Sequence, residues 1–135
     1  MSHLESKELG RRGERRAAWF YRLRGYSIVA RNLRFPEGEL DLIVRKGRTI
    51  VIAEVKARQS DAKGAPHEAV DATKQHRLVR LAESFLRRFP DRRSDLVVRF
   101  DVLSLLWSGR RFHLTHYEDA FRPMRQPGRP WQWKR

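Results

Sequence analysis

Acidic and basic side chains are set among apolar ones in two short segments of the chain. Residues 38–43 have the sequence Gly-Glu-Leu-Asp-Leu-Ile, and residues 53–58 have the sequence Ala-Glu-Val-Lys-Ala-Arg. Because the side chains of a β-strand alternate between its two faces, Glu54 and Lys56 share one face if the second segment is a strand. An acid and a lysine on one face, beside a second acidic segment, would suit the binding of a metal ion and a phosphate group.

The two segments are expected to pair as a β-hairpin, since short apolar and β-branched runs flank a turn at residues 45–48, Arg-Lys-Gly-Arg. If the first and last residues of this turn face each other, Asp41 lies opposite Ile52 and Glu39 lies opposite Glu54. Asp41 and Glu54 are then diagonal neighbours, about 7–8 Å apart at the backbone, which is close enough to share a cation. The predicted hairpin thus places three carboxylates on one face of the sheet.

Carboxylates held this close repel each other, and one of them has its pKa raised unless a cation intervenes. Mg²⁺ suits such a site because it takes one or two carboxylates, keeps several waters and accepts further oxygens from a substrate phosphate. We therefore expect Asp41, Glu54 and Glu39 to hold Mg²⁺, or Mn²⁺ in its place, so that the ion activates water for phosphodiester hydrolysis. Lys56 would orient or help to deprotonate that water, or contact the phosphate as a point charge.

The simpler interpretation of Glu54 and Lys56 is an exposed ion pair, which is common on strands and contributes little to stability. Their surroundings favour a functional site instead. Apolar residues occupy both faces of the two segments, with Leu40, Leu42 and residues 50–52 among them, and a strand that is apolar on both faces is buried. A charged side chain at the end of a buried strand needs a partner or a function.

Two further charged residues lie on helical stretches whose apolar faces are expected to cover the sheet. Glu14 shares a helix face with Ala17, Ala18 and Tyr21, so it could reach the carboxylates and assist catalysis; an ion pair with a nearby arginine is the alternative. Lys74 precedes the apolar stripe of the second helix by one turn. It would approach the phosphate, or cover the core with its aliphatic stem.

Hydrophobic periodicity and turn residues define the elements that position these side chains. Two helices are expected over residues 7–24 and 67–89, a loop over residues 57–66, and strands over residues 27–33, 39–44, 49–56, 95–107 and 112–117. The order α-β-β-β-α-β-β favours an α/β fold with a central mixed sheet flanked by helices, in a domain of residues 1–121. On the fourth strand, Asp101 is expected to pair with Arg99 and is assigned no catalytic role.

The balance of charge is strongly basic. Thirty Lys and Arg residues face sixteen Asp and Glu residues, for a net charge of +14 over 135 residues. Such an excess favours DNA, RNA or an anionic membrane as a partner; a generally arginine-rich composition is the alternative explanation. Among nucleic acids we expect DNA before RNA. The residues expected to contact it are Arg11, Arg12, Arg15, Arg58, Lys74 and Arg77.

The sequence also limits the classes of protein to be considered. The chain has no cysteine, which excludes disulfides and thiolate metal sites. It has neither an apolar run long enough to span a membrane nor an N-terminal signal sequence, so a cytoplasmic location is expected. Residues 122–135 contain three prolines, five Lys or Arg residues, two tryptophans and no acid, and we expect them to form a flexible basic tail.

Considered jointly, these residues resemble a known family. The pattern that carries the resemblance is Gly13-Glu14-x-x-Ala17, Gly25-Tyr26, Asn32, residues 38–43, Glu54-Val55-Lys56-x-Arg58 and Lys74. It is similar to the pattern of the YraN-like family of small bacterial proteins and covers about residues 9–121. That family is similar in its core to the restriction-endonuclease-like superfamily, whose signature is an acid followed by acid-x-lysine, and which includes the archaeal Holliday-junction resolvases.

The resemblance implies a restriction-endonuclease-like core in which Asp41, Glu54 and Lys56 are the signature residues and Glu14 is the helix acid that assists the metal site. Leu40 stands where the superfamily signature has proline. The implied function is a Mg²⁺-dependent endonuclease that hydrolyses DNA, with structured or branched DNA as a candidate substrate. A homodimer would supply two sites for two strands, although no segment of the sequence indicates an interface.

Two other functions remain open on the sequence alone. One is a binding protein for DNA or RNA that keeps the nuclease fold without turnover and holds single strands with its arginines and with Trp131 and Trp133. The other is a peripheral membrane or ribosome-associated protein that uses only its net charge. The carboxylates favour the nuclease, because acids beside an anionic ligand repel it and so do not help a pure binder.

Overall fold

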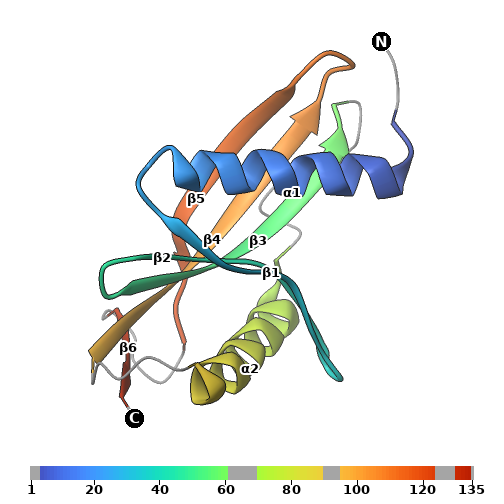
Figure 1. The fold of residues 1–135 in the computed structure, drawn as a ribbon. Helices are drawn as coiled ribbons and strands as arrows, with labels where there is room; N and C mark the ends of the chain where they lie inside the picture. Colours follow the sequence, from blue (N-terminus) through green and yellow to red (C-terminus); the bar gives the residue numbers. More distant parts are fainter. Residues whose placement is uncertain (1–3, 61–69, 90–94, 124–129, 135) are drawn as a thin grey trace.

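The helices and strands of the chain follow the predicted order, and one further strand is added to them (Figure 1). The computed structural model describes residues 4–60, 70–89, 95–123 and 130–134. The elements are α1 (Ser6–Arg22), β1 (Ser27–Phe35), β2 (Gly38–Lys46), β3 (Thr49–Gln59), α2 (Ala72–Arg88), β4 (Asp95–Trp107), β5 (Phe112–Phe121) and β6 (Trp131–Lys134). The predicted α/β fold, a central sheet flanked by helices, is therefore confirmed.

Most element bounds agree with the prediction to within a few residues. β3 continues to Gln59, through positions expected to belong to a loop, because these residues pair with β4. α2 begins at Ala72 rather than at residue 67. Most of the expected loop, at residues 61–66, and the first residues of the expected helix, 67–69, lie outside the described residues.

The strands form a mixed sheet in the order β1-β2-β3-β4-β5, and β6 pairs with the part of β4 that β5 leaves uncovered. Neighbouring strands are antiparallel except for β3 and β4, which are parallel. A parallel pair requires a crossover connection, and the connection from β3 to β4 contains α2. β3 and β4 therefore form the centre of the sheet on which both helices rest.

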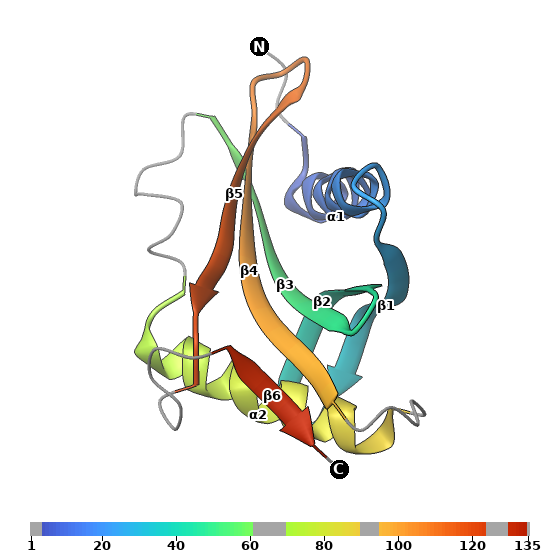
Figure 2. The same cartoon turned by 90° about the vertical axis from the view of Figure 1, so that its left-hand side faces the viewer.

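The two helices cover opposite faces of the sheet, as the perpendicular views of Figures 1 and 2 show. Alternate residues of β3 divide between them: Ile50 and Ile52 pack in the core cluster that contains α2, whereas Val51 and Ala53 pack in the cluster that contains α1. Glu54 continues the first series and so lies on the α2 side. In the described parts of the chain, neither helix has the length and apolar character needed to cross a membrane.

The β2–β3 hairpin has a different register from the predicted one. Lys46 pairs with Thr49, so Gly47 and Arg48 form the turn, whereas the prediction centred the turn on Lys46 and Gly47. The observed turn has glycine at its first central position with φ = +60°, as in a type II′ turn, while the predicted turn would need a positive φ at Lys46 as well. The predicted register is therefore wrong by two residues, but the faces are preserved because a strand repeats every two residues.

β6 is a strand that the sequence pattern did not predict. Trp131–Lys134 pair with Asp95–Val98 of β4, and the buried Trp131 ring stacks on Phe100 at a centroid distance of 5.8 Å. The expectation of a flexible tail is wrong for this strand, because the burial of Trp131 and the new strand hydrogen bonds offset the entropy lost on ordering. Residues 124–129 of the expected tail lie outside the described residues.

Candidate active site

The two predicted signature acids lie where β2 and β3 separate. Pairing of these strands ends at Leu42 and Ala53, and Asp41 and Glu54 are the next residues. If the register continued by one step, the two acids would face each other directly, rather than diagonally as predicted. Beyond the paired region the Val55 N–H donates to Asp41 Oδ2 at 2.9 Å. The Asp41 side chain, and not the backbone of β2, thus accepts a hydrogen bond from β3 at this point. The bond directs the Asp41 carboxylate toward the strand that carries Glu54.

The electrostatics of Asp41 show that the carboxylates crowd one another. Burial, together with the negative charges of Glu54, Glu14 and Glu39, raises the pKa of Asp41 to about 7. The hydrogen bond from the Val55 amide acts in the opposite sense, because it stabilises the charged form. Near pH 7 and without a cation, Asp41 therefore holds its proton about half of the time.

Glu54 is compensated by a lysine from α2. Its side chain is only 10% exposed, and Lys74 Nζ lies 2.7 Å from Glu54 Oε1. The N-cap of α2 fixes the start of this helix, since the Asp71 side chain accepts a hydrogen bond from the Lys74 amide at 2.9 Å. The sequence predicted either phosphate contact or cover for the core at Lys74. The structure pairs it with an acid of the candidate site.

Lys56 follows Glu54 by two residues on β3 and is half-buried. Strand alternation puts both side chains on the α2 side of the sheet. Within the described part of the chain, the Lys56 ammonium group makes no ion pair or hydrogen bond, while Glu54 bonds to Lys74. The simple Glu54–Lys56 ion pair is therefore not formed, and the ammonium group is available to a ligand.

α1 brings Glu14 to the carboxylates. The helix approaches β3 closely at the preceding residue, where a Cβ added to Gly13 would lie 2.6 Å from the Cβ of Ala57. Glu14 is half-buried and forms no ion pair with any described arginine, and its charge adds to the rise in the Asp41 pKa. The structure thus places Glu14 near the acids of the hairpin and not in an ion pair on its own helix.

Glu39 lies at the margin of the site. It is the cross-strand partner of Arg34, with Nε and Oε2 3.6 Å apart, and its effect on the Asp41 pKa is smaller than those of Glu54 and Glu14. Among the described residues, no group of three Asp, Glu or His side chains could hold a metal ion. An ion at this site would therefore be held by Asp41 and Glu54, with water and substrate oxygens as the remaining ligands.

The basic residues expected to contact nucleic acid do not form a single patch. They divide among three elements, with Arg11, Arg12 and Arg15 on α1, Arg58 on β3, and Lys74 and Arg77 on α2. Arg12 pairs with Glu8 at 3.0 Å, and Lys74 pairs with Glu54. Since α1 and α2 cover opposite faces of the sheet, one nucleic-acid strand cannot lie flat across all of them.

Comparison with known families adds a second line of evidence. Residues 13–105 match the model of the family described as "Uncharacterised protein family UPF0102". The chain belongs to the UPF0102 family. UPF0102 is the YraN family, so the resemblance found in the sequence is confirmed at the level of the family. The matched residues include Glu14, Asp41, Glu54, Lys56 and Lys74.

UPF0102 proteins of several bacteria match this chain over most of its length. A UPF0102 protein of Geobacter metallireducens is 38% identical over 118 residues, which cover 87% of this chain and 95% of that protein. One of Parvibaculum lavamentivorans is 43% identical over 120 residues, covering 89% of this chain and 86% of that protein. One of Symbiobacterium thermophilum is 45% identical over 100 residues, covering 74% and 83%. These names state the family and no activity.

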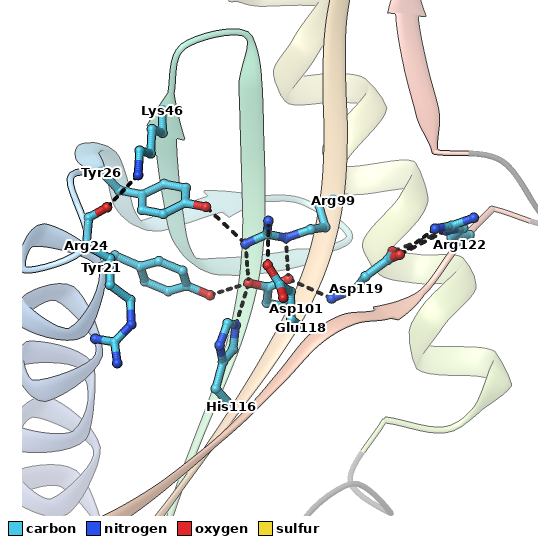
Figure 3. A network of polar contacts seen from close by, with 10 residues as sticks. All are labelled: Tyr21, Arg24, Tyr26, Lys46, Arg99, Asp101, His116, Glu118, Asp119 and Arg122. Carbon is cyan, nitrogen blue, oxygen red and sulfur yellow. Dashed lines mark hydrogen bonds and ion pairs between the residues drawn. The ribbon is translucent and has the colours of Figure 1, made fainter.

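A second cluster of polar residues in this UPF0102 chain surrounds a buried acid (Figure 3). The Asp101 carboxylate accepts hydrogen bonds from the Tyr21 hydroxyl at 2.7 Å, from Arg99 at 2.9 and 3.0 Å, and from the Asp119 amide at 3.0 Å. His116 Nε2 lies 2.8 Å from the same carboxylate. Burial alone would raise the pKa of Asp101, but the hydrogen bond from Arg99 and those from the other donors hold it below its ordinary value.

The predicted Arg99–Asp101 pair is thereby confirmed, but the sequence did not reveal its other partners. Tyr21 comes from α1 and His116 from β5, so spacing along β4 carries no information about them. One available signal is the hydroxyl of Tyr21 on a helix face expected to be buried, where it must find a partner. The network holds α1 against β4 and β5, and Tyr21 lies on the same face of α1 as Glu14.

Proposed function

We propose that this protein is a metal-dependent endonuclease that hydrolyses phosphodiester bonds in DNA. The observation that carries the proposal is the pair of acids Asp41 and Glu54, where burial and repulsion raise the pKa of Asp41 to about 7. Such a pair weakens the fold unless a cation relieves it, and strongly shifted pKa values gather at functional sites. The net charge of +14 supports a polyanionic substrate. Branched or otherwise structured DNA follows from the resemblance to the superfamily of Holliday-junction resolvases.

The donor set fits Mg²⁺, with Mn²⁺ as a substitute. Asp41 and Glu54 supply two carboxylates, and waters and phosphate oxygens would complete the octahedral shell that Mg²⁺ prefers. Bound there, the ion would neutralise charge on the phosphate and lower the pKa of a water molecule. Glu14 lies near enough to influence Asp41 and would assist through a bound water.

The chain's own residues hold the carboxylates and meet the phosphate. The Val55 amide fixes Asp41, and Lys74 fixes Glu54 while neutralising its charge. Lys56, with no ion pair among the described residues, would contact a phosphate oxygen or orient the attacking water. A lysine suits this task because its compact charge can follow the phosphate as the reaction proceeds.

Cleavage of a labelled panel of linear, flapped, gapped and four-way DNA, and of structured RNA, tests the proposal in Mg²⁺, Mn²⁺ or EDTA. We expect metal-dependent cutting of DNA that falls by on the order of 100-fold in Asp41→Ala and in Glu54→Ala, since each removes a carboxylate from the site. Asp95→Ala is the matched control, because it removes a partly exposed acid of the same sheet that lies 3.9 Å from Arg48. It should cut at the unchanged rate.

The opposite outcome is equally clear. Tight, salt-sensitive binding of DNA with no cutting in any metal, unaffected by either substitution, would overturn the nuclease. Cutting that persists in both variants would show that the carboxylates do not carry it. Cleavage of structured RNA in place of DNA would keep the chemistry and change the substrate.

A non-catalytic binder of DNA or RNA is the second candidate function. The observation that favours it is the 2.7 Å ion pair between Lys74 and Glu54, because it already supplies a cation to one of the two acids. Glu54 would then serve the fold alone. In that case Asp41→Asn should bind nucleic acid as tightly as the unchanged chain or more tightly, since a negative charge beside the ligand has been removed.

A further inference from the structure

The face of α1 that points away from the sheet carries an exposed tryptophan among arginines. Trp19 keeps 52% of its surface exposed, although tryptophan is on average a well-buried residue type. Residues three, four or seven positions away are its neighbours on a helix. On the exposed side these are Arg12, Arg15, Arg16, Arg22 and Leu23.

The positive charge around Trp19 is largely uncompensated. Glu8 is the acid of the hollow beside the ring, and it pairs with Arg12. The same hollow is lined by three arginines that form no ion pair among the described residues, Arg11, Arg15 and Arg16. The guanidinium of Arg22 lies 5.2 Å from the centroid of the Trp19 ring, which helps to fix the ring before a ligand arrives.

We propose that this surface binds an unpaired nucleic-acid strand, with one base stacked on Trp19 and the neighbouring phosphates on Arg15 and Arg16. Every base has a π-face, so stacking on an exposed aromatic ring is tolerant of sequence, and the adjacent arginines neutralise the backbone. The inference rests on the proposed function for its class of ligand, nucleic acid, but it uses none of the carboxylates.

The surface borders the carboxylate site without overlapping it. Arg15 follows Glu14 directly in α1, and Glu14 is the acid whose charge reaches Asp41. Glu54 lies on the α2 side of the sheet, so the sheet as well as α1 separates the outer face of α1 from that carboxylate.

Two other occupants fit this surface less well. A helix that binds an anionic membrane inserts a continuous apolar face, but that face of α1 is already covered by the sheet, with Ala17, Ala18 and Tyr21 fully buried. Only Trp19 and Leu23 remain as large exposed apolar side chains in the described structure. The bases of a duplex are stacked on one another, so a duplex offers no face to Trp19.

The affinity of the full chain for a labelled oligothymidylate of about 15 nucleotides tests the inference. Fluorescence anisotropy in EDTA, over a series of salt concentrations, gives both affinity and salt dependence. We expect Trp19→Ala to bind about tenfold more weakly with an unchanged salt dependence, because one stacked base is lost. Trp19→Phe should recover most of the affinity. The double variant Arg15→Ala/Arg16→Ala should instead lower the slope of log K against log salt by about 1.4, which is about 0.7 for each phosphate contact.

Arg80→Ala is the matched control. Arg80 is an exposed arginine of α2, on the other face of the sheet. This variant should bind as the unchanged chain does. Because all of these side chains are at the surface, the melting temperatures should stay close to that of the unchanged chain.

Equal affinity of Trp19→Ala and the unchanged chain, or no binding of the oligothymidylate, would overturn the inference. Duplex DNA or heparin bound as tightly as the single strand would also overturn it, since charge alone would then suffice. Trp19-dependent binding of anionic vesicles without strand binding would assign the surface to a membrane. These results stand apart from the proposed function: Trp19-dependent strand binding without cleavage in any metal would remove the nuclease and keep this surface.

Discussion

The charged form of the Asp41 carboxyl group is unfavourable in the folded chain, because the group is largely buried and lies near other acids. Its pKa of about 7 in the folded chain exceeds the ordinary value of 3.8, so the unfolded chain releases this proton first as the pH rises. The contribution of Asp41 to the free energy of unfolding therefore falls between about pH 4 and pH 7, and above pH 7 the full penalty remains. This residue thus trades stability for a site that attracts a cation.

Removal of that charge should stabilise the fold. We expect Asp41→Asn to raise the free energy of unfolding in EDTA at pH 8 by about 2 kcal/mol, roughly half of what the whole pKa shift would give, because solvent screens a partly exposed group. Asparagine keeps an oxygen for the Val55 amide while it removes the repulsion from Glu54. The gain should be smaller at pH 5, where Asp41 is mostly neutral in the folded chain. Urea denaturation at the two pH values measures both.

Mg²⁺ should supply the same relief to the unchanged chain. At pH 8 the ion should raise its melting temperature, and it should do so less in Asp41→Asn, which has lost a charged ligand. Asp95 is the first residue of β4, away from the two acids. Asp95→Asn is therefore the control and should respond to Mg²⁺ as the unchanged chain does. If Asp41→Asn were less stable than the unchanged chain at pH 8, that result would contradict the repulsion among the acids.

Among the elements, α1 depends on one small residue for its distance from β3. A Cβ added to Gly13 would lie 2.6 Å from the Cβ of Ala57, so Gly13→Ala must push the helix off the sheet. We expect it to lower the free energy of unfolding by about 1–3 kcal/mol, although alanine is the better helix former. It should also slow cleavage, since Glu14 moves away from Asp41. Urea denaturation and the cleavage assay measure the two effects.

Gly10→Ala is the matched control on the same helix. A Cβ there would meet nothing within 4 Å, so the substitution should raise the free energy of unfolding by about 0.5–1 kcal/mol through helix propensity alone. If Gly13→Ala stabilised the chain as Gly10→Ala does, the close approach at Ala57 would not be what positions α1.

The elements also show which relations are local enough to predict. Alternation along a strand sufficed to put Glu54 and Lys56 on one face, because that relation needs only the strand period. The hairpin register depended on whether Gly47, which has a positive φ, is the first or the second central residue of the turn. The contact of Lys74 with Glu54 depends on how α2 packs across the sheet, which no local pattern contains. β6 was missed for the same reason, since its pairing with β4 joins two segments that are far apart in the sequence.

Across the whole molecule, the Asp101 network joins elements that the sequence keeps apart (Figure 3). Tyr21 reaches the acid from α1 and His116 from β5, and Arg99 extends the network with Nη1 3.0 Å from Glu118. A buried carboxylate without partners would cost several kcal/mol, so each donor contributes to keeping these elements together. The network therefore acts on stability, and through the position of α1 on the carboxylate site.

Asp101→Asn should destabilise the molecule as a whole. We expect a loss of about 3 kcal/mol or more in the free energy of unfolding at pH 7, because Arg99 is left without its buried partner. Tyr21→Phe removes one donor and should cost about 1 kcal/mol. Glu118→Gln is the control: its acid is 62% exposed at the margin of the network, and the substitution should cost about 0.5 kcal/mol or less.

The pH dependence identifies the charge of Asp101 as the cause. Its pKa in the folded chain lies below the ordinary value of 3.8, so the stabilisation is complete above that value and is lost as the pH falls through the lowered pKa. Urea denaturation should therefore find a gap in the free energy of unfolding between the unchanged chain and Asp101→Asn at pH 5, and that gap should narrow in more acid solution. A gap that stays constant into strong acid would mean that packing around Asp101, and not its charge, holds α1 to β4 and β5.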